Sequence, residues 1–311
     1  MKKIIAALLI TIFVSSVFSG CGQGGQSSGD SQAPQEAQSS QSASNPEASS
    51  FNPDREITVI SRESGSGTRG AFTELTGVQV TVDGNTTDMT TPEAAIGNGT
   101  NAIMTNVAGD AYAIGYISTG SIGDTIKPVS VDGVAPTAGN IMAATYKISR
   151  PFIIVTQDNL SPVTEDFISF IMSAGGQEVI AESYIPIDQN ASAFQSSGAS
   201  GTVVIGGSTS VSPIMEKLRE AYLELNPGAV IEVHSTGSGA GITGAIDGLL
   251  DIGMSSREIR DSEMEELHQE ITICMDGIAV IVNNDNPIEN LTVEQIRQIF
   301  TGEVTRWSDV Q

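Results

Sequence analysis

The sequence predicts an α/β fold, in which strands alternate with helices and the sheets are mostly parallel. From residue 57 onward, short apolar runs alternate with segments of helical periodicity. Several of the apolar runs end in loops of Gly, Ser and Thr that lead into a helical segment. The chain has 33 glycines and only 5% aromatic residues, a composition typical of many short turns between small elements.

The first twenty residues are predicted to be an export signal. Lys2 and Lys3 precede an apolar run at residues 4–14, and small residues follow up to Cys21. The run is shorter than a membrane-spanning helix. The segment ending in Cys21 resembles a lipoprotein cleavage box with Phe18 in place of the usual Leu, so we expect Cys21 to be lipidated. An ordinary signal peptide with an incidental cysteine is the alternative.

Residues 21–55 are predicted to form a disordered tether. They consist almost entirely of Gly, Ser, Gln, Ala, Asn and Pro, and such a segment cannot bury enough apolar surface to order itself. A flexible connection between a lipid anchor and a folded domain is its natural use.

The folded region is expected to begin near residue 56. Helix 212–226 is the clearest element, because Ile214, Leu218 and Tyr222 share one face and Pro213 suits the first turn. Further helices are expected at residues 162–173, 177–182 and 292–300. Candidate strands lie at residues 57–61, 113–117, 152–156, 203–206, 230–234, 251–254 and 278–282.

Composition excludes several classes of function. The net charge of −23 repels nucleic acid, and it also means that an anion site here must depend on short-range hydrogen bonds. The two cysteines, Cys21 and Cys274, offer no disulfide framework, and Cys274 is expected to be a small buried residue. With only His234 and His268, the chain has little material for a metal site or a catalytic triad. We therefore expect no metal, no cofactor and no catalytic residue.

Three loops share one context, in which an apolar strand is followed by Gly, Ser and Thr and then by a helix. They are RESGSGTR at 62–69, GSTS at 207–210 and STGSGAG at 235–241, and a weaker fourth, SSR, lies at 255–257. Glycines let backbone N–H groups turn toward one point, and the following helix adds unpaired N–H donors. One such loop is more often a simple turn, but three in the same context predict a site for an oxyanion.

The same loops exclude two other kinds of chemistry. No Gly-Lys-Ser/Thr follows the glycines, so none of them is a nucleotide-binding P-loop. The pattern G-x-S-x-G does not occur around Ser66 or Ser238, so a nucleophile elbow is not expected.

Several site candidates also have a structural interpretation. Arg62 could pair with Glu63, and Thr209 or Ser212 could cap the helix that begins near Pro213. Other residues are expected to be structural only, namely Arg69 and Arg257 as partners of nearby acids, His234 at a strand end and Trp307 in packing.

Several long segments of the chain resemble one family, the phosphate-binding proteins of phosphate ABC transporters, among the two-lobed periplasmic-type binding proteins. The segments are ITVISRESGSGTRGAF, GGSTSVSPIMEKLREAY, HSTGSGAGITGAIDGLLDIGMSSRE and GIAVIVNNDNPIENLTVEQIRQIFTGEVTRWSDV. Together with YAIGYIS and SPVTEDFISFIMSAGGQEVI they cover nearly all of residues 57–311.

The resemblance implies a two-lobed, type II-like binding-protein fold with a ligand cleft between the lobes. One lobe would comprise residues 56–127 plus 279–311, and the other residues 128–278. In most relatives the GGSTS segment comes first, so the order here implies a circular permutation in which residues 189–201 join the former ends. A fragment of a tandem protein is the alternative.

The resemblance also implies the phosphate contacts. On matching positions they are Arg62, Ser66, Gly67 and Thr68 from the first loop, Thr209 and Ser210 from the second, Ser238 from the third and Ser256 from the fourth. Some relatives carry Asp where this chain has Ser256, and that Asp accepts the proton of hydrogen phosphate. Selectivity against sulfate is therefore open.

The function that the resemblance implies is capture of inorganic phosphate outside the cell for an ABC transporter permease. The protein would be a monomer held at the membrane only through lipidated Cys21, without contact to nucleic acid. Two alternatives are a binding protein for sulfate, molybdate or tungstate and a surface lipoprotein for phosphate sensing or adhesion. A phosphatase or acyl hydrolase is disfavoured by the absent motifs.

Overall fold

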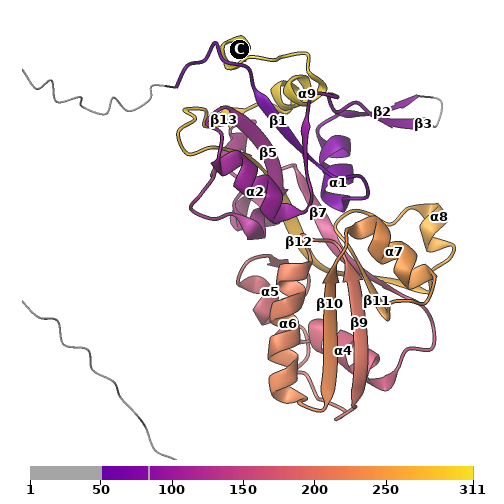
Figure 1. Cartoon of the computed structure of the whole chain (residues 1–311). Helices are drawn as coiled ribbons and strands as arrows, with labels where there is room; N and C mark the ends of the chain where they lie inside the picture. Colours follow the sequence, from indigo (N-terminus) through magenta and orange to yellow (C-terminus); the bar gives the residue numbers. More distant parts are fainter. Residues whose placement is uncertain (1–50, 83–84, 311) are drawn as a thin grey trace, which may run out of the picture. The chain divides into compact units, whose positions relative to one another are not determined.

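The structure is a computed structural model that describes residues 51–82 and 85–310 (Figure 1). The predicted export signal, Cys21 and most of the predicted tether lie outside the described residues. Among the helices that the structure describes, none is both long and apolar enough to cross a membrane.

Eleven strands form one sheet in the described region, with the order β10-β9-β11-β7-β12-β5-β1-β4 along its main path. At one end, β9 (Gly201–Gly207) pairs in parallel with β10 (Ala229–Ser235) and β11 (Ile252–Ser255). At the other end, β1 (Thr58–Arg62) pairs in parallel with β4 (Ala95–Gly97) and β5 (Ala113–Ser118). The predicted strands are confirmed, and each lies within about two residues of its predicted start except the longer β7 and β12.

The middle of the sheet is antiparallel. Strand β12 (Gln269–Val282) pairs antiparallel with β7 (Ser149–Thr156), β5, β6 (Lys127–Val131) and β8 (Ile185–Pro186), and β7 pairs antiparallel with β11. The expectation of mostly parallel sheets is therefore wrong, and the sheet is mixed. The reason is that β12 is fourteen residues long and reaches the strands of both ends.

Helices cover both ends of the sheet (Figure 1). The predicted helices are confirmed as α4 (Pro162–Ile171), α5 (Ala174–Ala181), α6 (Ser212–Leu225) and α9 (Val293–Thr301). The loops of the sequence analysis lead into α1 (Gly67–Leu75) and α7 (Ser238–Ile246). The remaining elements are α2 (Thr100–Ala108), α3 (Ala138–Met142), α8 (Asp261–Met264), β13 (Asn290–Leu291), two 3₁₀ turns (Thr119–Ser121 and Trp307–Asp309) and a hairpin of β2 (Gln79–Val82) with β3 (Asn85–Asp88).

Apolar side chains gather in two main regions. The first core contains stacked Phe72 and Tyr116, with Phe300 against them, and extends over β1, β5, β6 and α9. The second core contains Phe167 and Tyr222 and extends over β9, α4, α5 and α6. Residues 129–148 also supply side chains to the first core.

The two ends of the folded region lie side by side. The Ser308 amide donates to the Pro53 carbonyl at 2.7 Å, and the ring of Phe51 packs edge-on against Trp307. The packed chain therefore includes Phe51, in the last part of the predicted tether, because this aromatic ring finds apolar partners. Trp307 is buried, in agreement with its predicted packing role.

Candidate functional site

The four loops predicted to bind an anion meet where the carboxyl ends of β1, β9, β10 and β11 approach one another. The first leads into α1, where the Ser66 side chain caps the helix by accepting from the Arg69 amide at 3.3 Å. The third leads into α7, whose N-cap Gly237 has a φ of +92°, a conformation that glycine adopts without steric cost. Two helices therefore begin at the meeting point.

Direct hydrogen bonds join loops of the first core to loops of the second core. The Arg62 Nη2 donates to Thr209 Oγ1 at 2.8 Å, and the hydroxyls of Thr68 and Ser210 lie 2.8 Å apart. The backbones also touch, since the Gly239 amide donates to the Gly65 carbonyl at 3.0 Å. Residues separated by more than 140 positions in sequence thus form one contiguous site.

Three serine hydroxyls form a buried cluster beside these contacts. Ser208 Oγ donates to Ser256 Oγ at 2.8 Å, and the Ser256 amide donates to Ser238 Oγ at 3.1 Å. A methyl group built on Gly67 would lie 2.4 Å from Ser238 Oγ, so the first turn of α1 fits directly against this cluster. All four residues are buried, which makes their polar groups strong partners for one another or for an anion.

Arg62 is the charged member of the site, and its side chain is almost completely buried. Its Nε and Nη2 bind the carboxylate of Glu63 at 2.8 and 2.7 Å, which agrees with the predicted pairing. The pair is buried on the arginine side, however, and not a solvated surface pair. The Nη1 of Arg62 is buried without a hydrogen-bond partner, although buried donors are nearly always paired. A desolvated guanidinium N–H is suited to an anionic oxygen.

Glu63 holds Arg62 in place and remains charged. Burial acts to raise its pKa, but hydrogen bonds from Arg62 and from the Gly99 amide, together with the positive charge of Arg62, outweigh burial and lower the pKa below its ordinary value. The Gly99 amide donates to Glu63 Oε2 at 3.0 Å, so the carboxylate also connects β1 to the start of α2.

The structure brings together seven of the eight predicted contact residues through the contacts above, namely Arg62, Gly67, Thr68, Thr209, Ser210, Ser238 and Ser256. Ser66 lies beside them as a helix cap. The alternative role of Thr209 as a cap is not observed, because α6 has Val211 at its N-cap and no side-chain cap. The role of these residues as anion contacts stays a prediction.

Residues expected to be structural have the surroundings that the sequence predicts. Arg69 pairs with Asp88 at 2.7 Å and Arg257 with Glu263 at 2.6 Å. His234 is exposed at the end of β10. Cys274 is a free, buried cysteine, and burial raises the pKa of its thiol well above the ordinary value.

Sequence reasoning missed two residues of the site. Ser208 lies in one of the predicted loops but is not among the predicted contacts, and Glu63 is predicted only as an alternative partner of Arg62. The spacing inside a loop does not reveal which hydroxyl points inward. A residue next to an arginine can form the same ion pair whether the pair is exposed or buried.

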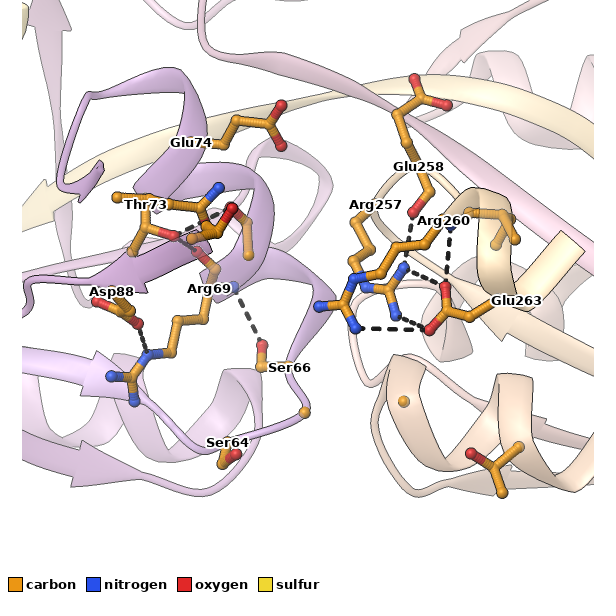
Figure 2. A pocket seen from close by; sticks show the side chains of 17 residues that line it. Ser64, Ser66, Arg69, Thr73, Glu74, Asp88, Arg257, Glu258, Arg260 and Glu263 are labelled. Carbon is orange, nitrogen blue, oxygen red and sulfur yellow. Dashed lines mark hydrogen bonds and ion pairs between the residues drawn. The ribbon is translucent and has the colours of Figure 1, made fainter. Parts of the chain in front are cut away.

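A cavity of about 1040 Å³ adjoins the outer side of the first loop (Figure 2). Its walls carry Arg69, Glu74 and Asp88 from one side and Arg257, Glu258 and Glu263 from the other. In the part of the chain that the structure describes, no group of His, Cys, Asp and Glu side chains could hold a metal ion.

Comparisons with known proteins agree on one family. Residues 37–174 and 192–311 match the family described as the PBP superfamily domain. The chain is 45% identical over 257 residues to the phosphate-binding protein PstS 2 of Streptococcus agalactiae serotype V, an alignment that covers 82% of this chain and 87% of that protein. Identity to PstS 2 of Streptococcus pneumoniae serotype 4 is 43%, over 82% of this chain and 88% of the relative.

A solved structure shows the same fold. The crystal structure of a phosphate ABC transporter phosphate-binding protein from Streptococcus pneumoniae TIGR4 superposes with a TM-score of 0.68 at 42% identity. The match covers 83% of this chain and all of that one.

Proposed function

The chain belongs to the phosphate-binding proteins of the PBP superfamily, and we propose that it captures inorganic phosphate outside the cell for import by an ABC transporter. The observation that carries this proposal is the convergence of donors from two cores around Arg62, whose buried Nη1 has no partner. A tetrahedral oxyanion offers many acceptor lone pairs and needs many converging donors of this kind.

The proposed contacts divide between the two cores. Arg62 and Thr68, with the N–H groups at the start of α1, would bind from the first core. Thr209, Ser210, Ser238 and Ser256 would bind from the second. Ser66 would contribute its hydroxyl hydrogen, because its oxygen already accepts from the Arg69 amide.

We propose that the two cores belong to two lobes that close on the anion. Strand β12 carries side chains in both cores, and β7 begins directly after Ile148 of the first core and packs in the second, so the two strands would act as the hinge. The lobes would comprise residues 51–148 with 278–310 and residues 149–277, a revision of the division predicted from the sequence. The circular permutation remains part of this proposal, supported by the contact between residues 51–56 and 305–310.

We also propose that the protein binds the anion without catalysing a reaction. The hydroxyls of the site are paired with other hydroxyls, amides or arginine, and in the described residues no histidine lies among them to act as a base. Glu63 is occupied by Arg62 and the Gly99 amide. Turnover of a phosphate ester by the purified protein would contradict this part.

Anion titrations test the function directly. Ligand-stripped protein is titrated calorimetrically with phosphate, sulfate, molybdate and tungstate at matched ionic strength. We expect saturable binding of one phosphate per chain and much weaker binding of the others. Saturable binding of one of the other anions, without binding of phosphate, would overturn the proposal in favour of a different oxyanion.

The cellular role needs a separate test, because a sensing or adhesion lipoprotein could bind the same anion. We expect deletion of the protein to abolish high-affinity phosphate uptake, whereas unchanged uptake would favour sensing or adhesion. Replacement Cys21→Ser should release the protein from the membrane fraction if lipidation anchors it. A single sedimenting species of about 30 kDa would support the monomer.

A further inference from the structure

A buried ion pair lies on the two strands that connect the cores. Arg150 of β7 and Asp276 of β12 are register partners in the sheet, and Arg150 Nη2 lies 3.1 Å from Asp276 Oδ2. Their side chains are 2% and 0% exposed. On β12, Cys274 packs in the second core and Ile278 in the first, so Asp276 lies at the crossing between them.

The carboxylate is anchored to the first core. Ser118 Oγ, at the end of β5, and Thr119 Oγ1 both donate to Asp276 Oδ1 at 2.9 Å. Each oxygen of Asp276 therefore has at least one donor, and its position relative to β5 is determined by two hydroxyls.

The Arg150 guanidinium also contacts the loop after β11, which belongs to the predicted anion site. Arg150 Nη1 donates to the backbone carbonyl of Ser256 at 2.9 Å. The Ser256 amide in turn donates to Ser238 Oγ, and the Ser256 hydroxyl accepts from Ser208 Oγ. Ser256 therefore contacts both other serines of the cluster, and Arg150 holds its backbone carbonyl in place.

Stability is a poor explanation for this pair. Burial lowers the pKa of Arg150 and raises the pKa of Asp276, the direction expected when desolvation opposes charge. Arg150 Nε is buried without a partner, which adds to the cost. Because well-packed apolar residues often replace buried ion pairs with equal or better stability, the pair is better explained by what it holds in place.

We propose that Arg150 is a positioning residue for anion binding, which holds Ser256 and its serine cluster in the binding geometry while Asp276 neutralises its charge. This inference rests on the proposed function. It also assigns a link between the cores, because the chain of contacts runs from Ser118 through Asp276 and Arg150 to Ser256.

The test is a double-mutant cycle on phosphate affinity, with wild type, Arg150→Met, Ser256→Ala and the double variant measured by calorimetry. Arg150→Met should weaken phosphate binding by about 10- to 150-fold, the range of one charge-assisted hydrogen bond. In the Ser256→Ala background the same change should cost clearly less than in wild type, because the Ser256 hydroxyl no longer has to be positioned, although the Ser256 amide still contacts Ser238. An unchanged affinity of Arg150→Met, or equal losses in both backgrounds, would overturn the inference.

Asp166→Asn provides the matched control. Asp166 is also buried and accepts hydrogen bonds from the Tyr222 hydroxyl at 2.9 Å and the Ser197 amide at 2.8 Å, within the second core. We expect this variant to lower the melting temperature and leave phosphate affinity unchanged. A loss of affinity equal to that of Arg150→Met would show that general destabilisation explains both, and would overturn the inference.

A substitute variant and the wild-type affinity separate the possible outcomes. If Arg150→Met does not fold, Arg150→Lys replaces it in the cycle, because lysine keeps the charge beside Asp276 but lacks the planar fork that also reaches Ser256. A wild type without phosphate affinity would refute the proposed function and this inference together. A wild type that binds, with an additive cycle, would refute only the role of Arg150.

Discussion

A single methyl group at Gly67 tests whether the first turn of α1 and the serine cluster form one binding site. Gly67 is the first residue of α1 and faces loops of the second core. A Cβ at this position would lie 2.4 Å from Ser238 Oγ, 2.9 Å from Ser256 Oγ and 3.0 Å from Ser238 Cβ. Alanine therefore cannot fit unless the two sides of the site move apart.

The size of the effect follows from these distances. Ordinary contacts begin at 3.4 Å, so the serine cluster must retreat by about 1 Å from α1. Overpacking of a well-packed region costs about 1–3 kcal/mol, which corresponds to about 5- to 150-fold weaker phosphate binding. If the lobes of the free protein can open, the cost should appear in binding and not in stability.

Calorimetry with phosphate, together with urea unfolding of the ligand-free protein, measures both quantities. Gly70→Ala is the control, because it lies in the same helix and its Cβ would meet only Arg257 Cδ at an ordinary 3.5 Å. We expect Gly70→Ala to keep wild-type affinity. Wild-type affinity in Gly67→Ala would refute the reasoning, since the close approach of α1 to Ser238 could then not belong to the bound form.

Three further predictions concern the charge and selectivity of the site. Arg62→Ala should weaken phosphate binding by about 10- to 150-fold in calorimetry, because it removes a charge-assisted donor. Lys147→Ala is the control and should bind phosphate like wild type. Equal affinities of the two variants would exclude Arg62 as a contact. Ser256→Asp should reduce sulfate binding far more than phosphate binding in parallel titrations. The reason is that a carboxylate accepts the proton of hydrogen phosphate and repels an anion that has no proton. An equal loss of both would argue against residue 256 as the selectivity determinant. Because the pKa of Glu63 is lowered in the folded protein, its contribution to stability is complete above pH about 4.3, its unfolded pKa, and is lost as pH falls through the folded pKa. In urea titrations between pH 7 and 3, Glu63→Gln should therefore show a smaller decline of the unfolding free energy than wild type. An unchanged slope would contradict the assignment.

Much of the chemistry of the site could be predicted from local sequence. The loops after β1, β9 and β10 were recognisable because glycine and hydroxyl residues directly follow apolar runs and precede helical periodicity. Arg62 and Ser238 are predicted contacts because of the family resemblance, and the structure brings their two loops together. Seven strands and four helices were predicted for a related reason, since periodicity and capping are properties of neighbouring residues, whereas short elements such as β4 and β6 were not predicted.

Orientation within the loops could not be predicted. Ser66 and Ser208 have similar surroundings in sequence, yet Ser66 caps α1 while Ser208 donates to Ser256 in the buried cluster. A serine hydroxyl can serve a cap, a turn or a ligand, and only the packing of the opposite loop decides among them. The exposure of the Arg62–Glu63 pair was unpredictable for the same reason.

The sequence by itself therefore determined the class of fold and the donor-rich composition of the loops, because these depend on residues close together along the chain. Only the tertiary structure decided the mixed sheet, the packing of residues 129–148 with the first core and the pairing of Arg150 with Asp276. Those features arise from contacts between segments far apart in the chain, such as β12 against both β5 and β7. Local composition does not indicate which distant strand will pair with a given strand. Burial and register in the packed sheet determine that partner.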